Sequence, residues 1–334
     1  MSDDSILCSN PDCAVAEDGR CIEGLSLDAC PNYGRRPTLR ELEQEAADEP
    51  IRHYELAPSL VLAGPDASLV LAARASRVVA VVATYDAGKT SLVAAVYDAF
   101  QRGPLAGMSF AGSSTLHSFE VACHDSRSAS RRTEATIFRT PRGDARYYHL
   151  DLRPTGGGAI IGLLLADRAG EEYVAVASDV VDAAPLFEVR RADVVTLLVD
   201  GARLVDSKER HNVRAEIEGI VQGLLDGGAL TGRQRLAVVL TKDDAVKASP
   251  RADSAHSDFD RLLSVLEGNF GGDFVEIAGL RTAASPKTAE AVRGEGLADL
   301  LAYWLRPVSV SAATAPVPSW PKRDFDRLRE VEHD

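Results

Sequence analysis

The sequence lacks long hydrophobic runs, is poor in aromatic residues and carries no excess of basic charge. Its 334 residues are 45% hydrophobic but only 6% aromatic. No run approaches the roughly 20 apolar residues that a helix needs to cross a bilayer, and the start, Met1–Asp4, is too polar for a secretory signal. We therefore expect a cytoplasmic protein with no membrane partner and a core that folds without disulfides.

The charge balance excludes further classes of function. Lys and Arg number 37 against 50 Asp and Glu, which gives a net charge of −13. This balance disfavours broad binding to nucleic acid or to anionic membranes. One local exception, residues 127–153, carries seven arginines. A solvated surface is the simpler interpretation, and contact with phosphate or with an acidic partner is the alternative.

Cysteine is also scarce, and its distribution is uneven. Four of the five cysteines lie within the first 30 residues, in a turn-rich segment with little else to order it. In a cytoplasmic chain such clustering favours metal over disulfides, and four thiolates close a tetrahedral zinc site. The spacing lacks Cys-x-x-Cys pairs, so free thiols, an iron–sulfur cluster and disulfides stay open. We expect a structural Zn²⁺ held by Cys8, Cys13, Cys21 and Cys30.

Four parts can be distinguished along the chain. We expect a small N-terminal cysteine-rich zinc segment (1–36), a connecting arm with short helices (37–76), an α/β domain (77–307) and a C-terminal tail (308–334). Capping residues and proline positions predict the arm's helices at 38–47 and 65–74. Trp320 lies in the tail, where it is a candidate contact for a partner.

The α/β domain is predicted from apolar runs that alternate with helical patterns. Runs of Val, Leu and Ile without alternation are typical of strands buried on both faces, and strand–helix alternation predicts a mostly parallel sheet flanked by helices. We expect six strands, at 78–83, 147–152, 160–166, 194–199, 236–240 and 274–277, with the second and third forming an antiparallel hairpin. Helices are expected at 89–101, 209–225, 259–269 and 297–305.

Residues 83–90, Ala-Thr-Tyr-Asp-Ala-Gly-Lys-Thr, connect the first strand to the first helix of this domain. This is the setting of a P-loop, in which backbone N–H groups at a helix start surround phosphate oxygens. We expect Lys89 to bind phosphate and Thr90 to ligate Mg²⁺. Ala83 replaces the usual first glycine, so the loop entry differs. The other residues expected to line the nucleotide phosphates are Asp86, Ala87, Gly88 and Ser91.

Two further segments are candidates for sensing the terminal phosphate. Asp167 ends a core strand and is expected to hold Mg²⁺ through water, while the Gly170 N–H bonds the γ-phosphate. Residues 107–118 read as a polar loop before the hairpin. There Thr115 is expected to offer its hydroxyl to Mg²⁺ and its N–H to the γ-phosphate, with Ser114 as the alternative.

A base-recognition turn, Thr241-Lys242-Asp243-Asp244, follows the fifth expected strand. A carboxylate at Asp244 accepts hydrogen bonds from guanine N1–H and its amino group, and adenine offers no such pair. The Lys242 stem packs over the base and its ammonium secures the P-loop. After the last strand, the backbone N–H of Ala283, or of Ala284 as the alternative, is expected to meet the guanine carbonyl.

These five motifs resemble, in order and spacing, those of the translation-factor-related, Ras-like P-loop GTPases, over residues 77–307. The run 114–120 and the N-terminal cysteines are similar to bacterial double-GTPase proteins, found in multi-gene systems thought to act in signalling or biological conflict. The resemblance implies a molecular switch that binds GTP or GDP and Mg²⁺ and works with effector or GTPase-activating subunits. It leaves homo- and hetero-oligomers open.

Two departures from the family pattern bear on hydrolysis. Glu171 stands where many Ras-like proteins place the glutamine that orients water, and its charge repels the γ-phosphate, so we expect a slow intrinsic GTPase. Asp86 stands where potassium-activated GTPases carry asparagine; a carboxylate there ligates K⁺, repels phosphate or caps a turn. The residues expected to carry catalysis are Lys89, Thr115, Asp167, Gly170 and Glu171.

Two other functions stay open at this point. One is an interaction module that keeps GTP or GDP as a structural ligand without hydrolysing it, which Ala83 and Glu171 permit. The other is a ribosome- or RNA-associated GTPase, against which the acidic balance counts.

Overall fold

The computed structural model describes Cys8, Val15, residues 19–21 and 24–34, and then residues 60–131, 143–284 and 293–307. The chain divides into two units, Met1–Leu56 and Ala57–Asp334. The expected helix at 38–47, Cys13 and the tail 308–334 lie outside the described residues. In the first unit the described part contains one short 3₁₀ helix, η1 (Leu27–Ala29).

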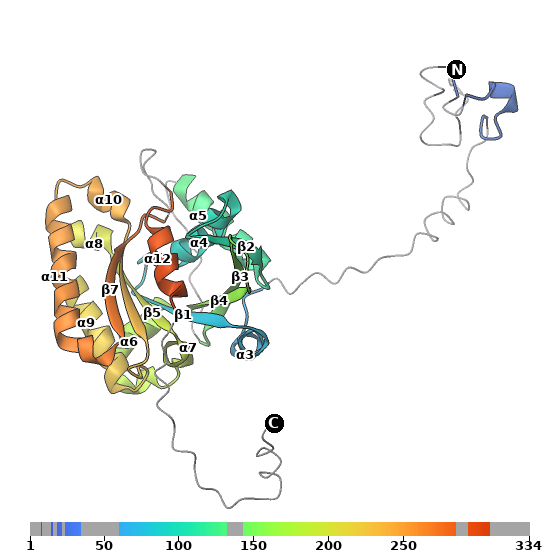
Figure 1. Ribbon diagram of the computed structural model, residues 1–334. Coiled ribbons are helices and arrows are strands. Elements are labelled where there is room, and N and C mark those ends of the chain that lie inside the picture. The colour runs from blue at the N-terminus through green and yellow to red at the C-terminus, as the bar shows by residue number, and fades with distance from the viewer. Residues whose placement is uncertain are drawn as a thin grey trace, which may run out of the picture. The chain divides into compact units, whose positions relative to one another are not determined.

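The second unit is built on one sheet with the strand order β2-β3-β4-β1-β5-β6-β7 (Figure 1). The central strands are parallel, and β3 runs antiparallel to both β2 and β4. This confirms the α/β class with a mostly parallel sheet. The strands are β1 (Ser76–Ala83), β2 (Met108–Gly112), β3 (Arg146–Pro154), β4 (Ile161–Asp167), β5 (Val194–Asp200), β6 (Arg235–Thr241) and β7 (Glu276–Arg281).

The sheet has seven strands, one more than the six expected from the sequence. The additional strand is β2, inside the segment interpreted above as a loop. It is a short strand at the edge of the sheet, paired with β3, and it contains Ser109, Ala111 and Gly112, so it has no apolar run to reveal it. The helix α5 (Leu116–Arg131) also begins within that segment.

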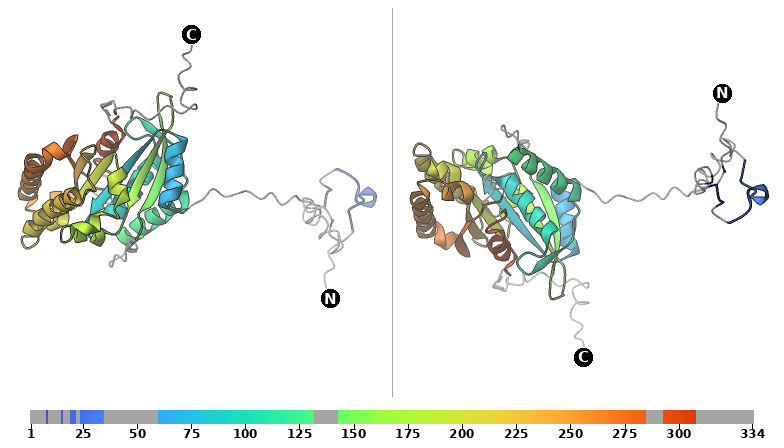
Figure 2. Two further views of the ribbon diagram at one scale, coloured as in Figure 1. Left: turned by 90° about the horizontal axis from the view of Figure 1, so that it is seen from below. Right: turned by 90° about the horizontal axis from the view of Figure 1, so that it is seen from above.

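Helices cover both faces of the sheet (Figures 1 and 2). On one face, Val79, Val81 and Ala83 of β1 belong to a core shared with α4 (Lys89–Arg102), α5 and α12 (Leu297–Leu305). On the other face, Ala80 and Val82 join a core with α6 (Gly170–Val176), α7 (Phe187–Arg191), α9 (Arg210–Asp226) and α11 (Ala252–Phe270). Shorter elements connect them: η2 (Val180–Ala183), α8 (Gly201–Val205), α10 (Asp243–Lys247) and η3 (Gly271–Asp273).

The end of the expected connecting arm packs onto the sheet. Residues 64–73 form α3 (Gly64–Ala73), close to the expected 65–74, and Ala67 packs against Val78 and Leu164. Just before this helix, Leu62 exchanges two 2.9 Å backbone hydrogen bonds with Tyr147 at the start of β3. The structure therefore makes this part of the arm a component of the α/β unit.

Among the described residues, no helix combines the length and the apolar character needed to cross a membrane.

Candidate nucleotide-binding site

Parallel strands bring the expected motifs to one edge of the sheet. β1, β4 and β6 end at Ala83, Asp167 and Thr241, and each is followed directly by a motif segment. The strands are linked through the parallel pairs β1–β4, β1–β5 and β5–β6. In such sheets ligands bind outside the carboxyl ends of the strands. The fold thus gathers at one edge three motif segments that lie far apart in the sequence.

The P-loop shows the backbone that phosphate binding requires. Gly88 is left-handed, with φ of 86°, at the N-cap of α4, and Asp86 is also left-handed, with φ of 58°. Lys89, Thr90 and Ser91 form the first turn of α4, whose N–H groups and dipole favour an anion. Turn and helix start together form the cradle expected for nucleotide phosphates.

Lys89 and Asp167 form a buried ion pair at the centre of the site. Lys89 Nζ lies 2.8 Å from Asp167 Oδ1, and the two residues are 9% and 5% exposed. An ammonium suits a phosphate oxygen and a carboxylate suits hydrated Mg²⁺. The donor set of Lys89, Thr90 and Asp167 therefore fits Mg²⁺ with a nucleotide, provided that this pair separates to admit them.

Gly170 packs directly against the P-loop backbone. A Cβ on this glycine would lie 2.8 Å from Ala83 O and 2.9 Å from the Thr84 carbonyl carbon. Only a residue without a side chain fits this approach. Glu171, also expected to act at the γ-phosphate, follows Gly170 in the first turn of α6.

The structure does not bring Thr115 together with the Lys89–Asp167 pair. The Thr115 hydroxyl is fully buried, accepts a 2.9 Å hydrogen bond from His149 N and donates to His149 O at 3.4 Å. His149 pairs with Leu164, whereas Arg146 pairs with Asp167. His149 and Arg146 are three residues apart, which is about 10 Å along a strand. Thr115, bound to His149, is therefore displaced by about that distance along the sheet from Asp167. The alternative residue, Ser114, is also tied to this strand, because its N–H donates to His149 Nδ1 at 3.1 Å.

The base-recognition turn is anchored to the P-loop. Thr241 Oγ1 donates to Ala87 O at 2.8 Å. Lys242, left-handed with φ of 54°, places its Nζ 3.1 Å from Asp86 Oδ2 and 3.0 Å from Asp200 Oδ2. Burial alone would lower the pKa of Lys242, but the carboxylates of Asp200 and Asp86 outweigh it and raise that pKa. The ammonium of Lys242 therefore stays charged and connects the base-recognition turn to the P-loop and to the end of β5.

Asp200 is a site residue that the sequence reasoning missed. It ends β5, caps α8 by accepting a 2.9 Å hydrogen bond from Ala202 N, and binds Lys242 with its other oxygen. The sequence does carry a signal for Asp200, because a glycine follows this carboxylate at the end of a strand. The structure shows why glycine is needed there: a Cβ on Gly201 would lie 2.5 Å from Thr241 O.

The two aspartates of the turn have different surroundings. Asp243 lies 2.8 Å from His256 Nε2 and 3.1 Å from Lys247 Nζ, so its carboxylate connects α10 to α11. Asp244, the residue expected to read the base, is 9% exposed and lies in the first turn of α10.

Ala283 is placed differently from the expectation. Its N–H donates to Glu295 O at 3.1 Å, and its carbonyl accepts from Gly294 N at 2.9 Å. The N–H expected to meet the guanine carbonyl is therefore engaged within the protein in this structure. Its neighbour Ala284, the alternative, is half-buried and is the last described residue before position 293.

In the first unit, three of the four clustered cysteines are described. Cys21 and Cys30 place their sulfurs 3.9 Å apart, and Cys8 pairs with Tyr33 in a β-bridge. No group of three or more metal-ligating side chains occurs among the described residues, a set that does not contain Cys13. Cys123 is a buried core thiol that donates to Ala94 O at 3.3 Å.

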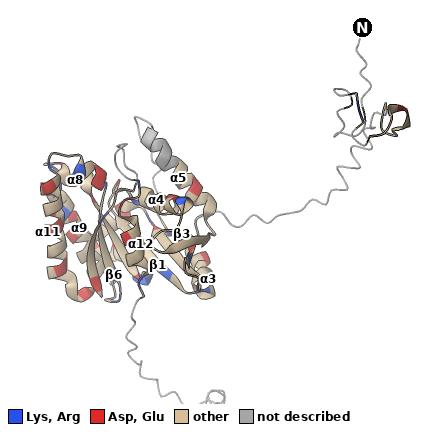
Figure 3. Cartoon of the chain, turned by 45° about the horizontal axis from the view of Figure 1, so that its top comes forward, with Lys and Arg blue, Asp and Glu red and all other residues tan. Residues whose placement is uncertain are grey.

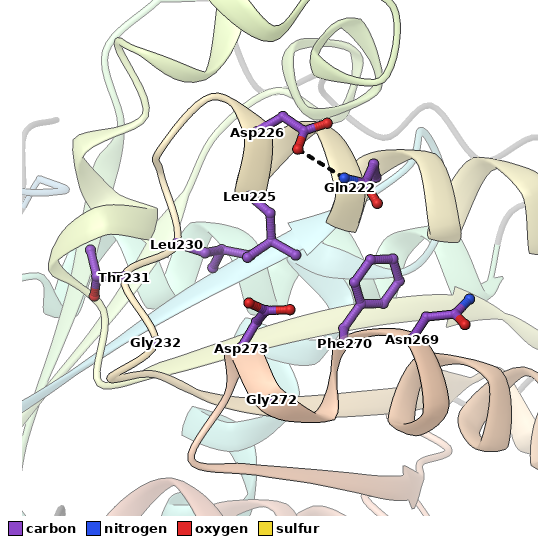
Figure 4. Close-up of a pocket in the computed structure, with 10 residues that line it drawn as sticks. All are labelled: Gln222, Leu225, Asp226, Leu230, Thr231, Gly232, Asn269, Phe270, Gly272 and Asp273. Atoms are coloured by element: carbon purple, nitrogen blue, oxygen red, sulfur yellow. Dashed lines mark hydrogen bonds between the residues drawn. The ribbon is translucent and has the colours of Figure 1, made fainter.

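A cleft of ≈ 660 Å³ lies elsewhere, between the ends of α9 and α11 (Figure 4). Leu230 and Gly232 in its wall precede β6, and Asp273 precedes β7. The cleft therefore lies at the amino ends of these strands, opposite to the edge that carries the motifs. It does not belong to the nucleotide site.

Comparisons with known proteins give a family match over most of the α/β domain. The family model described as Double-GTPase 2 matches residues 77–305. A solved structure, the signal recognition particle receptor SRβ-GTP/SRX complex from Chaetomium thermophilum, is 14% identical, with 69% of this chain and 97% of that chain covered. Its TM-score with this chain is 0.40. No curated protein matches.

Proposed function

Because the chain belongs to the Double-GTPase 2 family, we propose that it is a guanine-nucleotide switch with slow GTP hydrolysis. In this proposal it works in the cytoplasm as a subunit of a multi-protein bacterial signalling or conflict system, where an effector or GTPase-activating subunit stimulates it. The observation that carries the proposal is Lys242, whose ammonium joins the base-recognition turn to Asp86 of the P-loop.

The proposed roles follow the geometry of the site. Lys89 and the N–H groups at the start of α4 bind the phosphates, and Thr90 and Asp167 hold Mg²⁺. When bound, Mg²⁺ neutralises charge on the β- and γ-phosphates. Gly170 reports the γ-phosphate because its backbone already touches the P-loop. Asp244 selects guanine over adenine.

Slow hydrolysis is proposed from the charge of Glu171. A carboxylate beside the γ-phosphate accepts a hydrogen bond from water but repels the developing negative charge. We expect the isolated chain to turn over below about 1 s⁻¹. Stimulation by K⁺ through Asp86 is part of the proposal. It requires the cation to compete with the Lys242 ammonium, so equal rates in Na⁺ and K⁺ would remove it.

Native mass spectrometry of the purified full chain, followed by calorimetry with GDP, GTP and ADP, tests the proposal. Bound guanine nucleotide and clear discrimination against ADP support it. Asp244→Asn is expected to weaken GDP binding and to strengthen xanthosine diphosphate binding, because the amide reverses the donor pattern. A folded chain that binds no guanine nucleotide, or binds ADP equally well, contradicts the proposal.

A non-hydrolysing interaction module is the second candidate, favoured by Ala83 and Glu171. Single-turnover assays with GTP, with and without co-purified proteins, separate the two. The RNA-associated candidate is less favoured. In Figure 3 the ribbon positions of Lys and Arg alternate with those of Asp and Glu along the helices of the described residues, with no helix coloured as basic alone.

We propose a structural Zn²⁺ in the N-terminal segment as a separate feature. Thiolates 2.3 Å from a tetrahedral zinc lie about 3.8 Å apart, close to the 3.9 Å between the Cys21 and Cys30 sulfurs. Elemental analysis of the full chain is expected to give one zinc that Cys21→Ser removes and Cys123→Ser retains. Absence of zinc, or an intact mass showing a disulfide, contradicts the site.

A further inference from the structure

Arg168 lies in the sequence between two residues of the proposed switch, Asp167 and Gly170, and its side chain is buried. It is 5% exposed. Its guanidinium binds Glu188 in α7 through two hydrogen bonds, 2.7 Å from Nε to Oε1 and 3.1 Å from Nη2 to Oε2. Glu188 is fully buried and also accepts a 3.2 Å hydrogen bond from the Tyr173 hydroxyl in α6. This is the geometry of a strong, directional ion pair.

The remaining donors of Arg168 bind other segments. Nη2 donates to Pro185 O at 3.2 Å, in the turn that leads into α7. Nη1 donates to Gly143 O, three residues before β3, and lies 3.5 Å from Glu172 Oε1 in α6. Glu172 Oε1 in turn accepts from Gly143 N at 3.3 Å. One side chain therefore binds the segment before β3, α6 and α7.

The position of Arg168 makes these contacts relevant to the nucleotide state. Its neighbour Asp167 faces Lys89, and Gly170, two residues later, touches the P-loop backbone. A movement of residues 167–170 toward a γ-phosphate either carries the bound segments along or separates a buried ion pair. Separation leaves Glu188 charged and unpaired in the core, which is strongly unfavourable. Movement of the segments together is therefore the favoured response.

We propose that Arg168 is a positioning residue that couples the loop 167–170 to Gly143 and to α7, so that α7 responds to the bound nucleotide. The inference rests on the proposed guanine-nucleotide switch. It assigns a structural output to that switch, because α7 carries Phe187, whose side chain is 66% exposed. Arg168 itself touches neither nucleotide nor metal in this proposal.

Hydrogen exchange of the full chain, measured with GDP and with a non-hydrolysable GTP analogue, tests the coupling. In the wild type, exchange in peptides covering residues 143–147 and 185–191 is expected to differ between the two nucleotides by about fivefold or more, the lower end of usual coupling factors. Arg168→Met is expected to abolish this difference while binding of GDP persists. Arg168→Lys, which keeps the charge but loses the two-pronged contact, is expected to restore part of it.

Arg235→Met is the matched control. Arg235 is 3% exposed and binds Tyr303 O at 2.8 Å and Arg306 O at 2.9 Å, at the other end of the sheet. It is expected to lower stability but to keep the nucleotide-dependent difference. If Arg168→Met does not fold, Glu188→Gln, which keeps the side-chain volume, decides instead and is expected to abolish the difference.

The outcomes separate this inference from the proposed function. A wild type that binds GDP and the GTP analogue but shows equal exchange in residues 185–191 overturns the coupling alone. So does a difference that survives in both Arg168→Met and Glu188→Gln. A chain that binds neither nucleotide overturns the proposed function, and the coupling with it.

Discussion

Lys242 Nζ lies 3.1 Å from Asp86 Oδ2, so the residue expected to pack over the base holds the residue at the tip of the P-loop. The Lys242 side chain is 30% exposed and Asp86 is 58% exposed, whereas the second partner, Asp200, is 4% exposed. The buried contact with Asp200 therefore orients the lysine, and the contact with Asp86 is the weaker of the two.

Lys242→Met is expected to weaken GDP binding by tenfold or more, about 1.4 kcal/mol, because it removes the ammonium from both carboxylates and leaves buried Asp200 without this ion pair. Asp86→Asn is expected to change GDP binding less than about fivefold, since an exposed ion pair contributes at most about 1 kcal/mol. Calorimetry with GDP on both variants measures this order. A larger loss from Asp86→Asn than from Lys242→Met would contradict it.

Gly170→Ala is expected to keep GDP binding and to slow GTP hydrolysis by tenfold or more. The added methyl would lie 2.8 Å from Ala83 O, against backbone that has little room to yield. Gly268→Ala is the control, because a Cβ at that position in α11 meets nothing within 4 Å. Single-turnover hydrolysis and GDP titration give the two readouts. Unchanged hydrolysis in Gly170→Ala would show that the glycine does not act at the γ-phosphate.

Thr115→Val tests where the Mg²⁺ ligands lie. The substitution leaves the buried His149 N–H without its 2.9 Å acceptor, so we expect a loss of about 1–3 kcal/mol in the free energy of unfolding. Nucleotide binding is expected to keep its dependence on Mg²⁺, whereas Thr90→Val is expected to reduce that dependence. Denaturant titration and GTP binding with and without Mg²⁺ measure both. Loss of the Mg²⁺ dependence in Thr115→Val would restore the expectation drawn from the sequence.

His149 predicts how stability depends on pH. Burial lowers the pKa of His149 below its ordinary 6.5, and the charge of Asp151 opposes that shift without cancelling it. Because Nδ1 accepts from Ser114 N, the neutral ring is the one that fits the fold. A folded pKa below the unfolded value makes this stabilising contribution complete above pH 6.5, and it is lost as the pH falls from 6.5 toward the folded pKa.

Denaturant titration at about pH 7.5 and about pH 5.5 measures this contribution in the pH range where histidine titrates. The wild type is expected to lose stability at the lower pH, and His149→Asn is expected to lose less. His256→Asn, which alters the ring beside Asp243 instead, is the control. An equal pH dependence in the wild type and in His149→Asn would contradict the assignment.

Strands and helices were predictable where they are buried and therefore rich in apolar residues. The expected runs 194–199 and 236–240 are the inner strands β5 and β6, which are buried throughout, and the expected helix 297–305 matches α12. The edge strand β2 was not predictable, because pairing through backbone hydrogen bonds leaves little trace in its side chains.

The motifs of the site were predictable as local strings, but their partners were not. The P-loop and the base-recognition turn each follow a strand, as expected. Asp200 and Arg168 are instead defined by contacts with residues far away in sequence, Lys242 and Glu188. The strand-ending carboxylate followed by glycine could have marked Asp200 as a candidate, but no local pattern names either partner. Thr115 shows the same limit. A threonine in a polar segment is a reasonable Mg²⁺ ligand by sequence, but in the structure its hydroxyl accepts a hydrogen bond from the backbone of His149 in β3.

The two hydrogen bonds between Leu62 and Tyr147 set a limit on how the chain can be shortened. A fragment starting at Arg77, where the family match begins, would remove α3 and uncover Val78 and Leu164, which that helix shields. The smallest autonomous piece therefore begins upstream of Leu62. On expression, we expect a fragment that starts at Arg77 to aggregate and a fragment that starts near Ala57 to be monodisperse.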